Sequence, residues 1–216
     1  MKIAAFGDIH NSVEPIRSLP LNEFDLVIIT GDLTNFGGRD DAMAILDTVR
    51  QATQNILAVP GNLDHPPVLE LLEELDISIH GKGKIINERI GIFGCGGSNL
   101  TPFNTPIEFS EEKLLELLRQ AYEHVQDANL HILVSHTPPK DTGLDRISSG
   151  ANVGSQVVRE FIEEVQPALC LTGHIHEAKG ETELGKTKVI NPGMLKDGGW
   201  IEIDILDDLT VKTILH

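Results

Sequence analysis

Short apolar segments alternate with longer amphipathic segments along most of the chain. The apolar segments are rich in valine, isoleucine and leucine, as buried strands are, and they cover residues 3–6, 26–30, 56–59, 131–135 and 168–171. The amphipathic segments have apolar residues at helical spacing and cover residues 40–51, 66–75, 111–125 and 153–165. Strands that alternate with helices in this way predict an α/β fold with parallel strands.

Three stretches depart from this alternation. Residues 84–93 have the pattern of a β-hairpin that turns at about 87–89. Residues 182–215 have the pattern of consecutive antiparallel strands, which predicts a second sheet that is partly antiparallel. Residues 94–109 are irregular, and irregular segments of this length in compact proteins are often functional. No linker or repeat interrupts the chain, so we expect a single domain over residues 1–216.

The composition predicts which binding partners and which cellular location the protein has. The net charge of −16 predicts repulsion of long nucleic acids, but a local metal site would still admit a small phosphorylated substrate. No apolar run approaches the ~18 residues that span a bilayer, so we expect no membrane association. Asp8 comes too early for a secretory signal, and two cysteines provide no disulfide framework, with core packing expected for Cys95. We therefore expect a cytoplasmic protein, with a homo-oligomer as an open alternative to a monomer.

Each predicted strand ends in a turn that carries side chains able to bind a metal. These side chains are Asp8 and His10, then Asp32, then Asn62 with Asp64 and His65, then His136, and finally His174 and His176. Ligands of parallel α/β sheets bind at the carboxyl ends of the strands, so we expect these turns to converge. Carboxylate, amide and imidazole donors suit Mn, Fe, Zn, Co or Ni better than Ca or Mg. The set is large enough for two ions that share one bridging carboxylate.

Each of these turns has a simpler interpretation when it is taken alone. A Gly-Asp or Gly-Asn pair after a strand is commonly a turn or a helix cap. The joint pattern is more informative, because five of the nine histidines follow predicted strands. For the other four we expect structural or surface roles; they are His80, His124, His131 and His216.

The ordered set GD-x-H, GD, GN, H and GH-x-H, between residues 7 and 176, resembles the motifs of the calcineurin-like metallophosphoesterases. The segment GCGGSNLTPFNTP and the NPG at 191–193 are similar to the small prokaryotic branch of that family. The resemblance implies a four-layer αββα sandwich, in which two mixed β-sheets are flanked by helices. It also implies two divalent metal ions, with Mn as the first candidate and Fe, Zn, Ni or Co as alternatives.

The resemblance further implies which residues hold each ion. Asp32 would bridge the two ions and so take part in catalysis. One ion would be held by Asp8, His10, Asp32 and His176, and the other by Asp32, Asn62, His136 and His174. Two divalent ions outweigh the two aspartates and a bridging hydroxide, which leaves the site positive within an acidic protein.

The expected reaction is in-line attack of a metal-bound hydroxide on phosphorus, after which the leaving alkoxide needs a proton. Many family members have Gly-Asn-His at the third turn, and that histidine is thought to donate the proton or bind the substrate. Here Leu63 follows Asn62, and leucine can do neither. His65 is the nearest substitute and is restrained by the prolines at 66 and 67; the alternative is a helix-capping surface histidine. A site without an acid favours phosphodiesters with good leaving groups over alkyl monoesters, and nucleotide diesters are among the open alternatives.

Further residues are candidates for contact with the substrate. Asn62, Asn11 and Asn99 are the candidate substrate-binding amides, and Lys140 is a candidate phosphate contact; solvated side chains are the alternative.

Two other interpretations compete with the metallophosphoesterase. A metal-binding scaffold on the same fold is the first, and it is less favoured because all seven expected ligand positions are filled. A different metal hydrolase, such as one with the metallo-β-lactamase fold, is the second. That fold requires His-x-His-x-Asp-His early in the chain, whereas His174 and His176 come late and Glu177 follows them.

Overall fold

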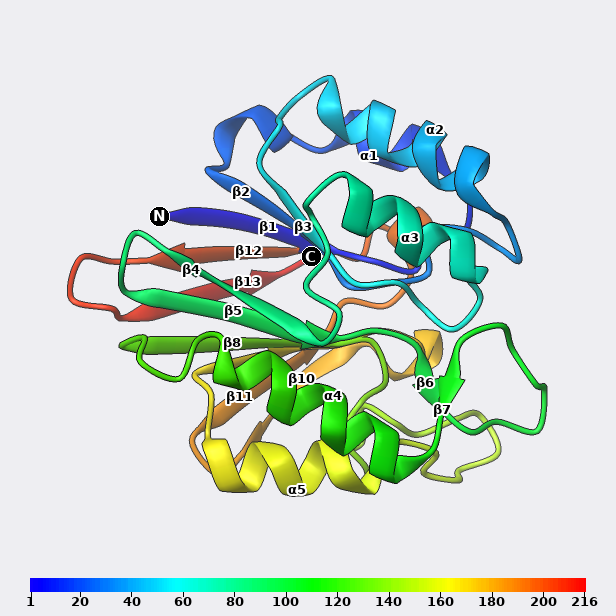
Figure 1. The fold of residues 1–216 in the computed structure, drawn as a ribbon, viewed down its shortest axis with the longest axis vertical. Helices are drawn as coiled ribbons and strands as arrows, with labels where there is room; N and C mark the ends of the chain where they lie inside the picture. The colour runs from blue at the N-terminus through cyan, green and yellow to red at the C-terminus, as the bar shows by residue number, and fades with distance from the viewer.

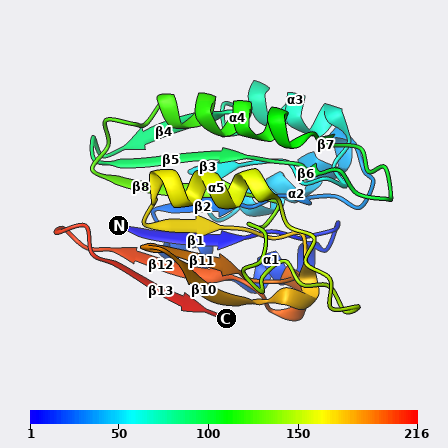
Figure 2. The same ribbon diagram turned by 90° about the horizontal axis from the view of Figure 1, so that it is seen from below.

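Two β-sheets lie face to face in the computed structural model, which describes all of residues 1–216, and helices cover both outer faces. Figure 1 shows the layers in the order helix, sheet, sheet, helix, and Figure 2 shows the helices of one outer layer in front of the strands. The expected four-layer αββα sandwich of two mixed sheets is therefore confirmed. No helix is both long and apolar enough to pass through a bilayer.

The first sheet has the strand order β13-β12-β1-β2-β3. Three of its strands are parallel, namely β1 (Lys2–Phe6), β2 (Leu26–Ile29) and β3 (Ile56–Ala58). Two antiparallel strands extend it, β12 (Ile201–Ile205) and β13 (Val211–Leu215). Its outer face is covered by α1 (Val13–Ser18), α2 (Arg39–Arg50) and α3 (Pro66–Glu74).

The second sheet has the strand order β10-β11-β9-β8-β5-β4. Its parallel strands are β5 (Ile90–Cys95), β8 (Leu130–Ser135), β9 (Leu169–Leu171) and β11 (Thr187–Asn191). Its two edges are antiparallel, β4 (Lys82–Ile86) and β10 (Gly180–Leu184). The outer helices are α4 (Glu111–Glu123) and α5 (Gln156–Val165).

Short elements complete the chain. They are a two-stranded ladder of β6 (Ser98–Asn99) and β7 (Glu108–Phe109), and the 3-10 helices η1 (Leu21–Glu23), η2 (His176–Ala178) and η3 (Leu195–Asp197).

Alternation along the strands builds a separate apolar core between each pair of layers. In β1, Ile3 and Ala5 pack against the other sheet, whereas Ala4 and Phe6 pack under the helices. In β9, Leu169 and Leu171 face the first sheet. Side chains two residues apart share a face of a strand, so a strand that is buried on both faces is apolar at every position. This explains why the strands could be identified as continuous apolar runs.

The structure confirms the five predicted strands and the four predicted helices, with small differences at their ends. Helix α5 begins at Gln156 rather than at 153 because Ser155 is its N-cap, where the hydroxyl accepts a hydrogen bond from Val158 N at 3.2 Å. The hairpin of β4 and β5 is also confirmed and is longer than expected. Helix α1 was not predicted, since six residues are too few for a periodic pattern.

One expectation about the C-terminal segment is wrong. The strands of residues 182–215 do not form one sheet, because β10 and β11 join the second sheet whereas β12 and β13 join the first. The chain crosses between the sheets after Asn191. Alternation identifies a strand but does not say which neighbour it pairs with, so both sheets are mixed.

Both cysteines are free and buried beneath α4 and α5. Burial raises the pKa of Cys95 to about 12, so the thiol is uncharged and belongs to the apolar core, as expected.

His80 is a buried structural histidine. Its Nδ1 accepts a hydrogen bond from Gly96 N at 2.9 Å, and its ring lies against Phe109 with centroids 5.6 Å apart. Burial lowers the pKa of His80 to about 4, so the folded protein holds the neutral ring.

The buried neutral ring predicts a loss of stability in acid. The unfolded chain takes up a proton at His80 near pH 6.5 and the folded chain only near pH 4, so the stabilisation is complete above pH 6.5 and declines as the pH falls towards 4. We expect His80 to account for about 3 kcal/mol of this decline in the free energy of unfolding. Urea unfolding of the wild type and of His80→Gln at pH 4–7 measures it. The exposed His124→Gln is the control, and equal pH slopes in the wild type and in His80→Gln would contradict the assignment.

Candidate metal centre

The carboxyl ends of β1, β2 and β3 in one sheet and of β8 and β9 in the other meet at one edge of the sandwich. A direct contact joins the turns of the two sheets, because His174 N lies 3.2 Å from both carboxylate oxygens of Asp8. The five turns therefore converge as predicted, although they come from two sheets rather than from one.

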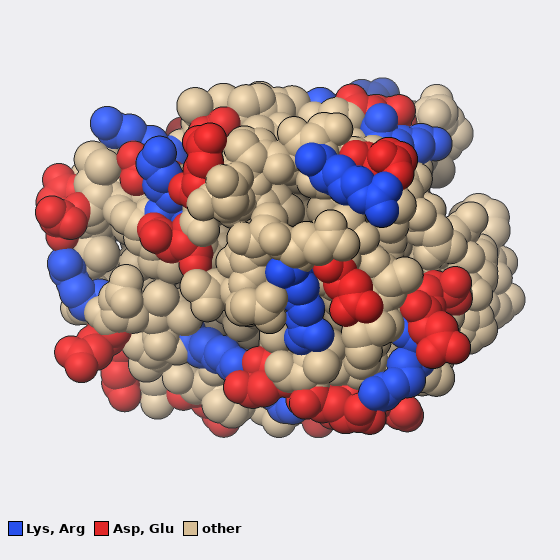
Figure 3. All heavy atoms as spheres, turned by 90° about the horizontal axis from the view of Figure 1, so that it is seen from above, with Lys and Arg blue, Asp and Glu red and all other residues tan.

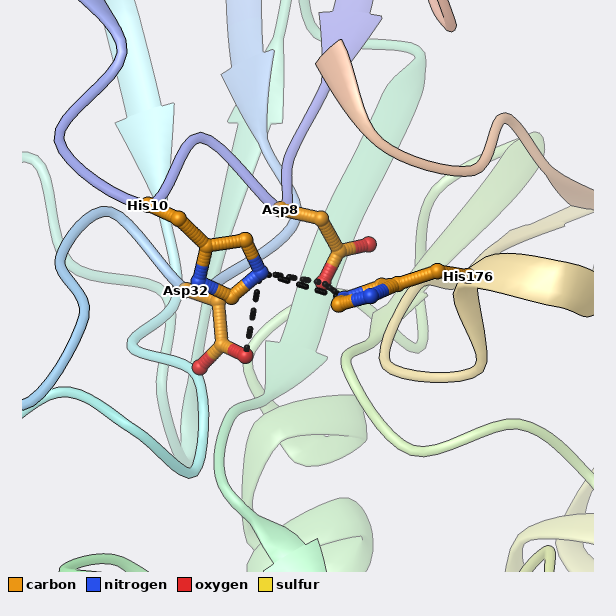
Figure 4. Close-up of side chains that lie close together, drawn as sticks. All are labelled: Asp8, His10, Asp32 and His176. Atoms are coloured by element: carbon orange, nitrogen blue, oxygen red, sulfur yellow. Dashed lines mark hydrogen bonds and ion pairs between the residues drawn. The ribbon is translucent and has the colours of Figure 1, made fainter. Parts of the chain in front are cut away.

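Four side chains form a compact cluster at this edge (Figure 4). One ligand atom from each of Asp8, His10, Asp32 and His176 lies within 4.8 Å of all the others. The Nε2 atoms of His10 and His176 are 3.1 Å apart, and His176 Nε2 is 3.2 Å from Asp8 Oδ1. Lone-pair donors crowded in this way repel one another unless a cation or a proton lies among them. The cluster therefore has the composition and spacing of a site for one divalent metal ion.

Three more candidate ligands lie beside this cluster. Asn62 Oδ1 is 2.8 Å from His174 Nδ1 and 3.1 Å from His136 Nε2. The two groups meet at Asp32, whose Oδ2 is 3.5 Å from His136 Nε2 and 3.9 Å from His10 Nε2. The structure thus brings all seven predicted ligands together, with one oxygen of Asp32 between them.

Left-handed backbone is concentrated in these turns. Asp8 (φ 48°), His10 (47°), Asn11 (65°), Asp32 (48°) and His174 (68°) all have positive φ. Aspartate, asparagine and histidine tolerate this conformation better than most residues, at a cost of about 1–2 kcal/mol each. Strain of this kind persists at functional sites, where the surrounding structure holds it in place.

Two glycines of the motifs are required by close approach. A Cβ atom on Gly61 would lie 1.9 Å from Asp32 Oδ1, and one on Gly173 would lie 2.6 Å from Asp8 Oδ2. The glycines that precede Asn62 and His174 therefore leave room for the carboxylates of the neighbouring turns.

Burial and neighbouring charges set the protonation of the second group. Burial works to lower the pKa of His136, but the carboxylate of Asp32 outweighs it and raises that pKa to about 9. Burial, together with the nearby His136, lowers the pKa of His174 to about 4, which keeps its ring neutral. His136 Nδ1 donates a hydrogen bond to Thr30 O at 2.9 Å, so its Nε2 points towards Asn62 and Asp32.

Asp64 supports the centre without joining it. Its buried carboxylate accepts hydrogen bonds from Gly61 N at 2.8 Å and from Thr34 N at 2.7 Å, which ties the turn after β2 to the turn after β3. Burial, reinforced by the charge of Asp32, raises the pKa of Asp64 to about 6.

A second support comes from the irregular segment between β6 and β7. Thr105 Oγ1 accepts a hydrogen bond from Asn62 Nδ2 at 3.0 Å and donates one to Glu108 Oε1 at 2.6 Å. These contacts orient the amide so that Asn62 Oδ1 faces the two histidines. Thr105 and Glu108 were not among the predicted site residues, and the only signal for them in the sequence was the length of the irregular segment.

A cleft of about 710 Å³ opens beside the centre and is lined in part by Asp32, Asn62, His174 and His176. Leu63 also lines it, and its backbone N–H donates to Asp32 Oδ1 at 2.8 Å. The cleft thus presents a leucine beside Asn62, with no further histidine among its lining residues.

The remaining candidate residues differ in their relation to the cleft. His65 is the exposed N-cap of α3 and does not line the cleft, so its position gives no support to a role as proton donor. Asn11 is also exposed and outside the lining. Lys140 and Asn99 do line it, but both ends of the Asn99 amide are already hydrogen-bonded within the protein. The amide of Asn62 is engaged on both sides in the same way.

Comparisons with known sequences agree with this geometry. The family model described as calcineurin-like phosphoesterase matches residues 1–178. An uncharacterized protein of Methanocaldococcus jannaschii is 34% identical over 196 residues, which cover 89% of this chain and 88% of that protein. A probable glycerophosphodiester phosphodiesterase of Arcobacter nitrofigilis is 26% identical over 156 residues, which cover 70% of this chain and 56% of that protein.

Solved structures with little sequence identity share the fold. The protein TT1561 of Thermus thermophilus aligns with a TM-score of 0.76 at 20% identity, over 99% of this chain and 98% of that chain. A dimetal phosphatase from Danio rerio aligns with a TM-score of 0.66 at 13% identity, over 100% of this chain and 98% of that chain.

The link from Glu108 through Thr105 to Asn62 predicts a specific effect on metal affinity. Thr105→Val keeps the shape of the side chain but frees the amide of Asn62, so we expect Mn²⁺ to bind about 10–100-fold more weakly at the Asn62 half of the centre. Isothermal titration calorimetry measures the change. Thr101→Val is the matched control, because Thr101 Oγ1 also donates to Glu108 Oε1 at 2.6 Å but does not contact Asn62. An equal loss of Mn²⁺ affinity in the two variants would show that the affinity depends on the structure of the loop and not on the orientation of the Asn62 amide.

Proposed function

The chain belongs to the calcineurin-like phosphoesterase family, and on this premise we propose that it hydrolyses phosphodiesters with the help of two divalent metal ions. One observation carries the proposal: the cluster of Asp8, His10, Asp32 and His176 shares an aspartate oxygen with a second group of potential ligands. When bound, a pair of such ions acidifies a water nucleophile and neutralises the charge that develops on the phosphoryl oxygens.

The donor set supports this pair of ions. Asp8, His10 and His176 complete one site with Asp32, and Asn62, His136 and His174 complete the other. Mixed nitrogen and oxygen donors favour Mn, Fe, Zn, Co or Ni over Ca and Mg, and we propose Mn as the native ion. His10 Nδ1 is buried without a hydrogen-bond partner, so Nε2 is the nitrogen of His10 that is directed at the other ligands.

The cleft supports phosphodiesters more than alkyl monoesters. Apart from the proposed ligands, its titratable groups are Lys140 and Glu111. Glu111 is engaged by Ser155 Oγ at 2.6 Å and by Val157 N at 3.0 Å. Lys140 is then the only further group in the lining that carries a proton, and an ammonium is a weak acid, so the cleft favours leaving groups that depart as anions. The similarity to a probable glycerophosphodiester phosphodiesterase supports the same class of substrate.

A screen of metals against substrates tests the proposal. We expect the metal-stripped protein to be inactive and the protein reloaded with Mn²⁺ to cleave bis(p-nitrophenyl) phosphate faster than alkyl phosphate monoesters. Asn62→Ala removes a ligand from one half of the centre and should lower kcat/KM by about 100-fold or more. Asn11→Ala, outside the cleft, is the control. Stoichiometric metal binding without turnover of any ester would instead identify a metal-binding scaffold.

Two substitutions test whether a histidine donates the proton to the leaving group. Because His65 lies outside the cleft, we expect His65→Ala to cleave esters with good and poor leaving groups at wild-type rates. Leu63→His places an imidazole in the cleft lining and should accelerate poor leaving groups selectively, by up to about 10²-fold. The measurement is kcat/KM across aryl and alkyl esters whose leaving groups differ in pKa. A selective loss for poor leaving groups in His65→Ala would instead make His65 the acid.

A further inference from the structure

Large apolar side chains are exposed at only five positions in the protein, and three of them line the cleft beside the metal centre. The three are Phe36, 56% exposed, Leu100, 68% exposed, and Phe103, 80% exposed. The other two are Ile85 and Ile214, outside the cleft. Figure 3 shows charged side chains scattered over one face, and an uncharged lobe at the edge where β6 and β7 lie in Figure 1. An apolar surface concentrated at a cleft marks a binding site more than scattered exposure does.

Phe36 is unfavourable in its place on two independent grounds. Its ring is exposed to water, and its backbone has a φ of 55°, in the left-handed region that bulky residues rarely adopt. A glycine would relieve the backbone strain and remove the exposed ring. A side chain that costs stability in the protein without ligand is expected to have a function.

Both apolar segments are held at fixed positions relative to the proposed ligands. Phe36 N donates a hydrogen bond to the carbonyl of Leu63 at 3.1 Å, and Leu63 directly follows Asn62. The loop that carries Leu100 and Phe103 is anchored by Thr105, which bonds the amide of Asn62. A group bound against these side chains would therefore lie at a defined place beside the phosphoryl site.

Polar side chains also line the cleft. Asn152 and Gln156 each donate an amide N–H to a neighbouring carboxylate, which leaves their amide oxygens as free acceptors. Lys140 lines the cleft as well. A plain hydrocarbon chain would cover these polar groups without pairing them, whereas a flat ring can stack on phenyl groups and leave its edge to polar contacts.

We infer that the cleft binds a flat aromatic group of the phosphoester, with the ring against Phe36 and Phe103 and the phosphoryl group at the metal centre. This inference rests on the proposed function and adds the substrate class to it. The volume of the cleft is in the range that accommodates an organic group larger than one ring.

Phosphonates that cannot be hydrolysed test the recognition of the ring separately from catalysis. We expect the Mn²⁺-loaded protein to bind phenylphosphonate about ten-fold more tightly than methylphosphonate in isothermal titration calorimetry, because only the former offers a ring to the cleft. Cyclohexylphosphonate has as many ring atoms but is not flat, and should bind more weakly than phenylphosphonate. Tighter binding of cyclohexylphosphonate would indicate an aliphatic group, and equal binding of all three, or no binding of phenylphosphonate, would overturn the inference.

Variants separate a role in binding from a role in structure. Phe36→Gly and Phe103→Ser should each remove most of the preference for the phenyl group and leave the affinity for methylphosphonate unchanged. Phe36→Gly should also unfold at the same or a higher urea concentration than the wild type, since its backbone strain is relieved. Ile214→Thr is the matched control, because Ile214 is also 56% exposed but lies on β13. A destabilised Phe36→Gly that keeps the phenyl preference would show a structural role only.

Turnover distinguishes the two levels of the proposal. The substrate is bis(p-nitrophenyl) phosphate, which offers a ring on either side of phosphorus, and its KM should be about ten-fold higher for Phe36→Gly than for the wild type. Hydrolysis by both proteins with equal KM would refute the ring site and leave the phosphodiesterase intact. A preference for phenylphosphonate without hydrolysis of any ester would support the ring site and refute the proposed phosphodiesterase activity.

Discussion

The carboxylate of Asp32 is the constraint on which the rest of the site depends. One of its oxygens accepts the backbone N–H of Leu63, and the other faces His10 on one side and His136 on the other. This double use requires the turn after β3 to pass so close that only glycine fits at position 61. The short motifs are therefore interdependent, because the residues of each turn pack against the residues of the neighbouring turns.

The same turns also set the chemistry of the cleft. Asn62 is oriented by Thr105 and Glu108, and the loop that these residues anchor carries apolar side chains into the cleft. Leu63 brings a further apolar group into the lining of the cleft beside Asn62. The environment is consequently charged at one end, where the ligands lie, and apolar along the adjoining wall. Such a gradient suits an ester that joins an anionic group to an organic ring.

The sequence predicted what depends on local pattern. Apolar runs identified the central strands because both of their faces are buried, and the convergence of the candidate ligands could be expected because they lie in the turns after these strands. It did not predict the pairing of β11 with β9, since alternation is the same in either sheet. Nor did it identify Thr105 or Phe36, whose roles arise from contacts with turns far along the chain. His65 shows the converse, because its nearness in sequence to Asn62 does not bring its side chain into the lining of the cleft.

The proposed ligands come from both halves of the sandwich. Asp8, Asp32 and Asn62 follow strands of the first sheet, whereas His136, His174 and His176 follow strands of the second. Ions held between them would cross-link two layers that otherwise adhere through apolar side chains. Binding of the ions and folding would then be linked equilibria. The concentration of free metal would therefore also set the free energy of unfolding of the protein.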